Sequence, residues 1–182
     1  MLKLILLILL YQIYKMEYRI ETLADKLLIG KSLYTSYKND QTRVLWQSFG
    51  PLIASIKNRV EPNLFSMQDF EGLDVAKDLT FETTFKKWAA VEVNSIEDIP
   101  EGLESLELKG GLYVVFLYKG GPAGAAAAFQ YIFQTWVPQS MYTIDDRIHF
   151  ELIGPKYKNN SEDSEEEIWI PIRERVAKES IV

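Results

Sequence analysis

The chain has 182 residues, and its 47% hydrophobic content is enough for a substantial core, in one domain or in two fused halves. The formal net charge of −6 argues against direct nucleic-acid binding, which would need clustered lysine and arginine. The absence of cysteine excludes disulfides and thiolate chemistry, and the single histidine, His149, excludes a metal site made of histidines alone. We therefore expect no metal and no cofactor.

Residues 1–15 form an apolar N-terminal extension. Its unbroken apolar run, residues 4–10, is shorter than the roughly 20 residues that a membrane-spanning helix needs. No small-residue cleavage site of a secretory signal follows it. We expect no membrane span and a cytoplasmic protein, in which the extension is a short helix docked on the domain or on a protein partner, or lies upstream of the true start. An export signal or membrane anchor is the alternative.

The first half of the domain, about residues 17–93, begins with strands and then changes to a helical period. From Asp40, which can cap a helix, apolar residues recur at three- and four-residue steps, and Gly50 and Pro51 break or kink that helix. A loop over 94–108 holds Pro100 and Gly102 and marks the internal boundary. Alternation and β-branched or aromatic content predict strands over 17–23, 26–36, 62–70 and 81–93.

The second half, about residues 109–173, repeats the order of elements. Strands are predicted over 112–118, 147–152 and 166–172, and a helix over 123–136. The charged stretch 156–165 is expected to be a solvated loop. The chain therefore contains strand–helix–strand–strand twice, with an extra strand in front, although the two halves share almost no residue identity.

The order of these elements, with several short motifs, resembles a known family. In the second half the motifs are GGLYVVFLYKG, an alanine-rich helix ending in TWVPQS, then FELIG and IWIPI; KLLIGKS and AAVEV fit in the first half. Together they resemble the gyrase-inhibitor-like effector-binding domain, which is also the ligand-binding part of AraC-type and MerR-type multidrug regulators. The resemblance implies an α+β domain over residues 16–176, with duplicated strand–helix–strand–strand units, an antiparallel sheet and a pseudo-two-fold groove that binds ligand.

The resemblance also implies a function. Family members bind bulky, often cationic aromatic compounds, and a subset hydrolyses strained, cyclopropane-containing genotoxins. The regulators carry a helix-turn-helix before this domain, for which the N-terminal extension is too short. We therefore expect a stand-alone domain that senses or sequesters bulky hydrophobic or cationic compounds. The alternatives are a hydrolase of strained electrophiles that uses the same glutamate, and an interaction protein that inhibits DNA gyrase.

Alternation along the strands nominates the ligand-binding residues, because every second side chain shares a face. Glu151 shares a face with His149, opposite Phe150 and Leu152, which we expect to pack beneath the helices. The resemblance places its ligand-contacting glutamate at Glu151, on the open face. His149 is read as a polar surface residue. An ordinary exposed position or a structural salt bridge remains the alternative for Glu151.

The other wall of the groove is assigned to aromatic and acidic residues. Trp88 and Glu92 share a face across the small Ala90, which leaves room for a flat guest. Trp169 is expected to face the groove, whereas Tyr113 belongs either to the pocket or to the core. Core packing remains the alternative for Trp88.

A carboxylate walled by aromatic rings suits a lipophilic cation. The acid neutralises the charge at reduced dielectric, and the ring faces add roughly 0.5–2 kcal/mol of cation–π attraction. The same desolvation raises a glutamate pKa toward neutrality, as general acid–base catalysis requires. In an enzyme, Glu151 or Glu92 would activate water and Tyr113 would donate a proton, so the inventory of residues does not separate binding from hydrolysis.

Overall fold

The computed structural model describes residues 16–159 and 161–175, so the apolar extension over residues 1–15 lies outside the described residues. The strands are β1 (Tyr18–Leu23), β2 (Lys26–Thr35), β3 (Leu64–Asp69), β4 (Phe85–Val93), β5 (Glu104–Leu108), β6 (Gly111–Lys119), β7 (Tyr142–Ile144), β8 (His149–Ile153) and β9 (Glu165–Glu174). The helices are α2 (Thr42–Phe49), the 3₁₀ helix η1 (Gly50–Ser55), α3 (Val75–Asp78), α4 (Pro122–Tyr131), the π-helix η2 (Ile132–Trp136) and α5 (Val137–Gln139).

The described strands form one antiparallel sheet in the order β1-β6-β9-β8-β3-β4-β2-β5, with β7 added on β9. The second half contributes β6-β9-β8 and the first half contributes β3-β4-β2. The order of strands is therefore mirrored about the β8–β3 pair, as the duplicated units predict. The α+β class and the antiparallel sheet are confirmed.

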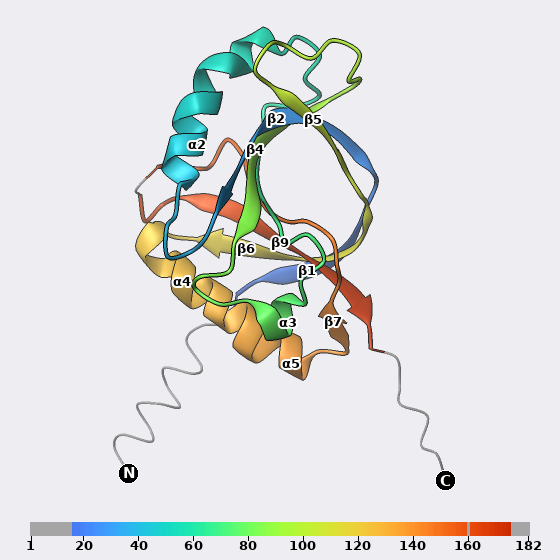
Figure 1. The fold of residues 1–182 in the computed structure, drawn as a ribbon. Coiled ribbons are helices and arrows are strands. Elements are labelled where there is room, and N and C mark those ends of the chain that lie inside the picture. The colour runs from blue at the N-terminus through green and yellow to red at the C-terminus, as the bar shows by residue number, and fades with distance from the viewer. Residues whose placement is uncertain (1–15, 160, 176–182) are drawn as a thin grey trace, which may run out of the picture.

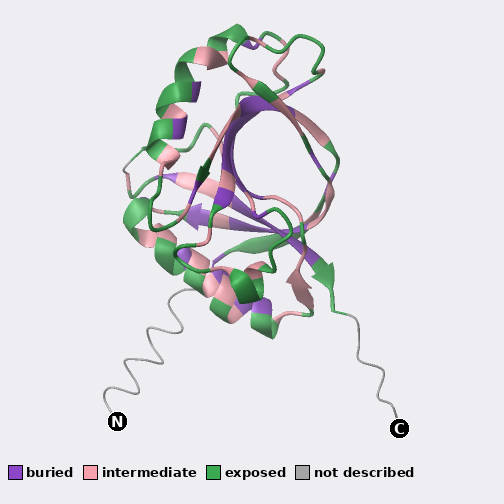
Figure 2. Ribbon diagram, in the orientation of Figure 1, coloured by how far each residue is buried: buried purple, intermediate pink, exposed green. Residues whose placement is uncertain are grey.

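The sheet curls strongly, and the long helices lie on its outer side (Figure 1). Over the first half, Leu45 and Phe49 of α2 pack on Ile29 and Val91. Over the second half, Ile132 and the neighbouring helical residues cover β6 and β9. The inner side of the curled sheet has a core of its own, drawn from both halves (Figure 2). Its fully buried or nearly buried members include Phe65, Met67, Trp88, Tyr113, Phe150 and Trp169.

The predicted break in the first helix is confirmed. Asp40 accepts a hydrogen bond from the Thr42 backbone N–H at 2.9 Å, one residue before the N-cap Gln41. The α-helical turn pattern stops at Phe49, and a 3₁₀ helix begins at Gly50 with Pro51 in its first turn. This is the position where a proline costs a helix least, because the first-turn N–H has no intrahelical partner.

Three short elements differ from the expectation. The loop predicted over 94–108 contains β5, which pairs with β2 from Lys26↔Leu108 to Gly30↔Glu104. Strand β7 and helix α3 lie in segments read as connections. Each of these elements has five residues or fewer. Tertiary pairing, rather than an alternation detectable in sequence, stabilises strands this short.

Among the helices of the described residues, none combines the length and the hydropathy needed to cross a bilayer.

Candidate functional site

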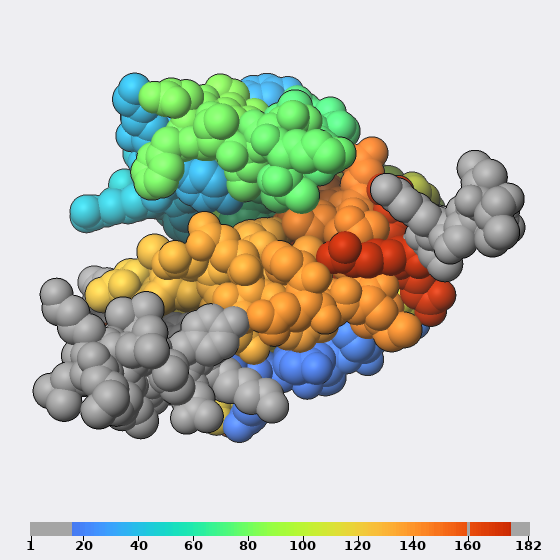
Figure 3. Space-filling view, turned by 90° about the horizontal axis from the view of Figure 1, so that it is seen from below, coloured from blue at the N-terminus to red at the C-terminus, as the bar shows by residue number. Residues whose placement is uncertain are grey.

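A cavity of about 310 Å³, the central cavity, lies between the two halves on the helix side of the sheet. Its floor comes from strands of both halves, and its walls come from α2, α4 and the two loops before α2 and β9. Figure 3 shows the surface hollowed between the first half (cyan to green) and α4 (yellow to orange). Its polar and charged lining residues include Tyr37, Asp40, Ser66, Gln68, Lys87, Glu151, Tyr157 and Glu166.

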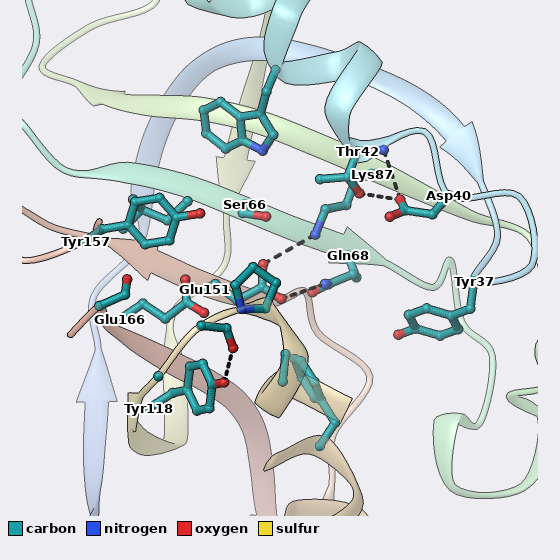
Figure 4. Close-up of a pocket in the computed structure, with 18 of the residues that line it drawn as sticks. Tyr37, Asp40, Thr42, Ser66, Gln68, Lys87, Tyr118, Glu151, Tyr157 and Glu166 are labelled. Atoms are coloured by element: carbon teal, nitrogen blue, oxygen red, sulfur yellow. Dashed lines mark hydrogen bonds and ion pairs between the residues drawn. The ribbon is translucent and has the colours of Figure 1, made fainter. Parts of the chain in front are cut away.

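Glu151 of β8 points into the central cavity, and two polar residues of the first half hold it there. The Gln68 side-chain amide donates to one carboxylate oxygen at 3.0 Å, and Lys87 Nζ lies 3.3 Å from the other. The Lys87 side chain is only 5% exposed and that of Glu151 15%, so this is a largely buried ion pair (Figure 4). Such a pair is costly to break from one side, because the remaining charge is left buried without compensation.

The register of the sheet explains why Lys87 reaches Glu151. Glu151 lies opposite Ser66 on β3, and Ser66 lies opposite Ala89 on β4. Residues directly opposite share a face of the sheet, so the odd-numbered residues of β4 join Glu151. Phe85 and Lys87 therefore line the cavity with it.

Glu166 of β9 is a second carboxylate in the same cavity. Its strand neighbour Tyr118 and its diagonal neighbour Glu151 share the helix side of the sheet. Burial, reinforced by the negative charge of Glu151 and opposed by Lys87, raises the pKa of Glu166 to about 7. Glu166 therefore changes charge near neutral pH, as a general acid or a proton-linked binding residue requires.

Aromatic rings from three parts of the chain surround these charges. Trp46 of α2 and Phe129 of α4 line the cavity, as do Tyr37 and Tyr157, which lie on opposite sides of Glu151 in Figure 4. Burial, with the negative charges of Glu151 and Asp40, raises the pKa of Tyr37 to about 12. Burial, Glu166 and Glu151 in that order also raise the pKa of Tyr157. The nearby carboxylates therefore add to the effect of burial on the pKa of both phenols.

The structure corrects the assignment of Trp88 and Glu92 to the groove with Glu151. Both project from the opposite side of the sheet, because the register puts the odd residues of β4 beside Glu151. Trp88 is 3% exposed within the inner core. Glu92 accepts hydrogen bonds from Lys26 Nζ at 2.8 and 2.9 Å.

Trp169 and Tyr113 also lie on the inner side. Trp169 stacks on Phe150, with ring centroids 5.2 Å apart, and both line a smaller cavity of about 220 Å³ together with Glu92. The Tyr113 hydroxyl donates to the Ile148 carbonyl at 3.1 Å, and burial raises the pKa of Tyr113 to about 12. Phe150 therefore packs inside the curled sheet rather than beneath the helices, which reverses the expected placement of the two faces of β8.

His149 is buried rather than a surface residue. It is 3% exposed, and its ring lies edge-on to Phe70 and stacked near Phe133, at centroid distances of 5.1 and 6.2 Å. Its Nε2 is buried without a hydrogen-bond partner among the described residues. Burial, with a contribution from Arg147, lowers the pKa of His149 to about 3.

Glu151, nominated from the sequence, lines the central cavity, whereas the sequence analysis did not nominate its partners Gln68 and Lys87. A signal for Lys87 was present, because a lone lysine interrupts the apolar side chains on the Phe85–Ala89 face of a strand. Gln68 is likewise a polar residue inside an otherwise buried strand. Glu166 sits within a run of acidic residues typical of a solvated edge, so nothing in the sequence distinguished it.

Comparison with known proteins gives one family and several similar folds. The family model described as GyrI-like small molecule binding domain matches residues 16–173. The structure of SAV2435 bound to tetraphenylphosphonium superposes with a TM-score of 0.64 and 21% identity, covering 87% of this chain and 94% of that one. No curated protein sequence matches the chain.

Two further structures show the same fold in different settings. EcmrR, in its complex with DNA, has a TM-score of 0.69 and 16% identity, covering 96% of this chain and 65% of that one. A hydrolase encoded by lin2189 from Listeria innocua has a TM-score of 0.59 and 12% identity, covering 90% of this chain and 95% of that one. At these identities the likeness concerns the fold.

Proposed function

Because the chain belongs to the GyrI-like small-molecule-binding domain family, we propose that its central cavity binds bulky, hydrophobic, positively charged compounds, which the protein senses or sequesters. The observation that carries this proposal is the pair of carboxylates, Glu151 and Glu166, enclosed by aromatic rings from both halves. A lipophilic cation gains charge compensation at reduced dielectric and cation–π attraction of roughly 0.5–2 kcal/mol per favourable ring. Tetraphenylphosphonium, present in one similar structure, is a suitable probe.

Binding is measured by titrating tetraphenylphosphonium against tryptophan fluorescence, since Trp46 lines the cavity. We expect a saturable response that Trp46→Phe largely removes. Glu151→Gln should weaken binding more than about tenfold, because the cavity loses a negative charge and keeps the positive charge of Lys87. Lys87→Gln should strengthen binding, because it removes the positive charge that competes with the ligand.

The control is Glu92→Gln, which removes the acid of another partly buried lysine–glutamate pair, on the other side of the sheet. The affinity of Glu92→Gln for tetraphenylphosphonium should equal that of the wild type. Circular dichroism and thermal melting establish that each variant is folded before titration. A wild type without saturable binding, or a folded Glu151→Gln variant with unchanged affinity, contradicts the proposal.

Hydrolysis of strained electrophiles has less support. Two of the three residues expected to carry it, Glu92 and Tyr113, lie on the other side of the sheet from Glu151. The Tyr113 hydroxyl donates to backbone carbonyl groups rather than toward the central cavity. We therefore propose binding alone.

A further inference from the structure

The two carboxylates of the central cavity differ in their protein partners. Glu151 accepts a hydrogen bond from Gln68 and pairs with Lys87. Across residues 16–159 and 161–175, neither a hydrogen bond nor an ion pair engages the Glu166 side chain. In Figure 4 the Glu151 carboxylate is joined by dashed lines to Lys87 and Gln68, and Glu166 and Tyr157 stand on its other side. The protein therefore neutralises the charge of Glu151 but leaves the carboxylate of Glu166 without a partner among the described residues.

We propose that Glu166, rather than Glu151, is the counter-ion of a bound monovalent cation, and that the cation enters the cavity in exchange for the proton of Glu166. The inference rests on the proposed function, since it concerns the same cavity and the same class of ligand. In the exchange, a protonated Glu166 and a free cation give a bound cation, an ionised Glu166 and one proton released to solvent. Charge is conserved within the cavity.

Strand geometry places Glu166 close enough to act on the same ligand as Glu151. Glu151 lies opposite Ile168 on β9, and Glu166 is two residues from Ile168 on the same face. Such diagonal neighbours lie about 7–8 Å apart, with their Cβ atoms somewhat closer. A bulky cation resting on Glu166 therefore also contacts the walls that surround Glu151.

The groups facing Glu166 favour a proton at that position when the cavity is empty. From β8 it faces Glu151, from β4 Lys87, and from β6 Tyr118, whose hydroxyl donates to the Gly121 carbonyl. From the β8–β9 loop it faces Tyr157 and the exposed Lys158, and Tyr37 and Asp40 lie at the far wall. Helix α4 presents only apolar residues to the cavity, including Ala125 and Phe129.

These surroundings explain why Glu166 is protonated in the empty cavity and why a bound cation releases that proton. Burial and the charge of Glu151 raise the pKa of Glu166 to about 7, with Lys87 opposing them. A cation at van der Waals distance favours the ionised form and so expels the proton. Because Lys87 already neutralises Glu151, Glu166 is the acid next to this pair without a protein partner in the described part of the chain, and it matches a single positive charge. A second ligand charge beside the pair would be desolvated without a partner.

The test is calorimetric titration of the full chain with tetraphenylphosphonium at pH 6, 7 and 8, in buffers of different ionisation enthalpy. We expect release of close to one proton at pH 6 and almost none at pH 8, with affinity about tenfold higher at pH 8 than at pH 6. Glu166→Gln should release no proton, lose the pH dependence and bind at least about tenfold more weakly than the wild type at pH 8. Glu165→Gln, the same change one residue away, should behave as the wild type.

Tetraphenylborate, an anion of the same shape, should not bind at any of these pH values. The outcomes separate the two claims. If the wild type fails to bind tetraphenylphosphonium at pH 8, the proposed function falls, and this inference falls with it. If the wild type binds without releasing a proton, or if Glu166→Gln binds as tightly and with the same pH dependence, the inference alone is wrong. The proton count in the wild type decides the matter even if Glu166→Gln does not fold.

Discussion

His149 shows how a residue read as polar surface becomes part of the core. It shares the helix side of β8 with Glu151, as alternation predicts, but Phe70 and Phe133 cover it. These rings come from a loop of the first half and from the π-helix η2 of the second. Contacts between residues this far apart in sequence are set by the register of the sheet and the docking of the helix. Strand alternation carries neither piece of information.

The burial of His149 makes stability depend on pH in a predictable direction. The pKa of His149 falls to about 3 in the folded protein, against about 6.5 in an unfolded chain, so below pH 6.5 the unfolded state binds more protons. The stabilising effect of the neutral imidazole is complete above pH 6.5 and is lost as the pH falls toward 3. We expect His149→Phe to remove this loss, because phenylalanine fills a similar space between the two rings without a buried orphan nitrogen.

Urea unfolding of the wild type and His149→Phe at pH 7 and pH 5 measures the effect. The free energy of unfolding of the variant should fall by about 2 kcal/mol less than that of the wild type over this interval. His149 is the single histidine of the chain, so no other imidazole contributes to the difference. Equal losses in the two proteins would show that the imidazole is not held neutral in the fold.

At the scale of elements, the loop between β8 and β9 contributes more to the cavity than its charge suggests. Its sequence reads as a solvated stretch, but Ser164 is 4% exposed, and its side-chain oxygen accepts from the Lys158 backbone N–H at 3.0 Å. The Ser164 carbonyl also accepts from the Gly120 N–H at 2.9 Å. These bonds fix the loop against the start of α4 and place Tyr157 in the lining of the cavity.

Removing the Tyr157 ring therefore tests the loop as part of the binding site. We expect Tyr157→Ala to weaken tetraphenylphosphonium binding about three- to tenfold, the equivalent of one ring contact with a cation. Thermal stability should change little, because the residue is 37% exposed. Tyr34→Ala is the matched control, since Tyr34 is 58% exposed and lies outside the cavity. Equal affinities of the two variants would remove the loop from the site.

Elements were predictable in proportion to their length and amphipathic regularity. Long strands such as β4 and β6, and the helix broken at Gly50, follow from alternation, helical spacing and proline chemistry. Strands β5 and β7 are short and depend on partners distant in sequence. For β4 and β8, the sequence predicted correctly which side chains share a face. Which face meets the helices was not, because both sides of this sheet are apolar.

At the scale of the whole molecule, the repeat was predictable and the curl was not. The duplicated order of elements anticipates the mirrored strand order about β8 and β3. The curl creates an inner core of large aromatic residues, which includes Trp88, Tyr113 and Trp169 and keeps them away from the central cavity. Open sheets twist, but closure toward a ring depends on how the two edges are connected.

The two edges of this sheet are joined by very short connections. Strand β1 lies at one edge and β5 at the other, yet β1 leads into β2 through Ala24 and Asp25, and β5 leads into β6 through Lys109 and Gly110. The connections touch each other, because the Gly110 N–H donates to Asp25 Oδ1 at 2.8 Å. The close approach leaves no room for a side chain at Gly110, where a Cβ atom would lie 2.3 Å from the Leu23 carbonyl oxygen.

We expect Gly110→Ala to force the two connections apart and to lower the free energy of unfolding by about 1–3 kcal/mol, in the range of overpacking at a tight contact. Gly154→Ala is the control, because a Cβ there meets only Asn63 Oδ1 at an ordinary 3.5 Å, and its stability should stay within about 0.5 kcal/mol of the wild type. Urea unfolding measures both variants. Since the inner core spans both halves, loosening this contact should expose it, so Gly110→Ala should also bind more of a hydrophobic dye than Gly154→Ala before the main transition. Equal stability and dye binding in the two variants would mean that the edges of the sheet do not depend on this contact to stay together.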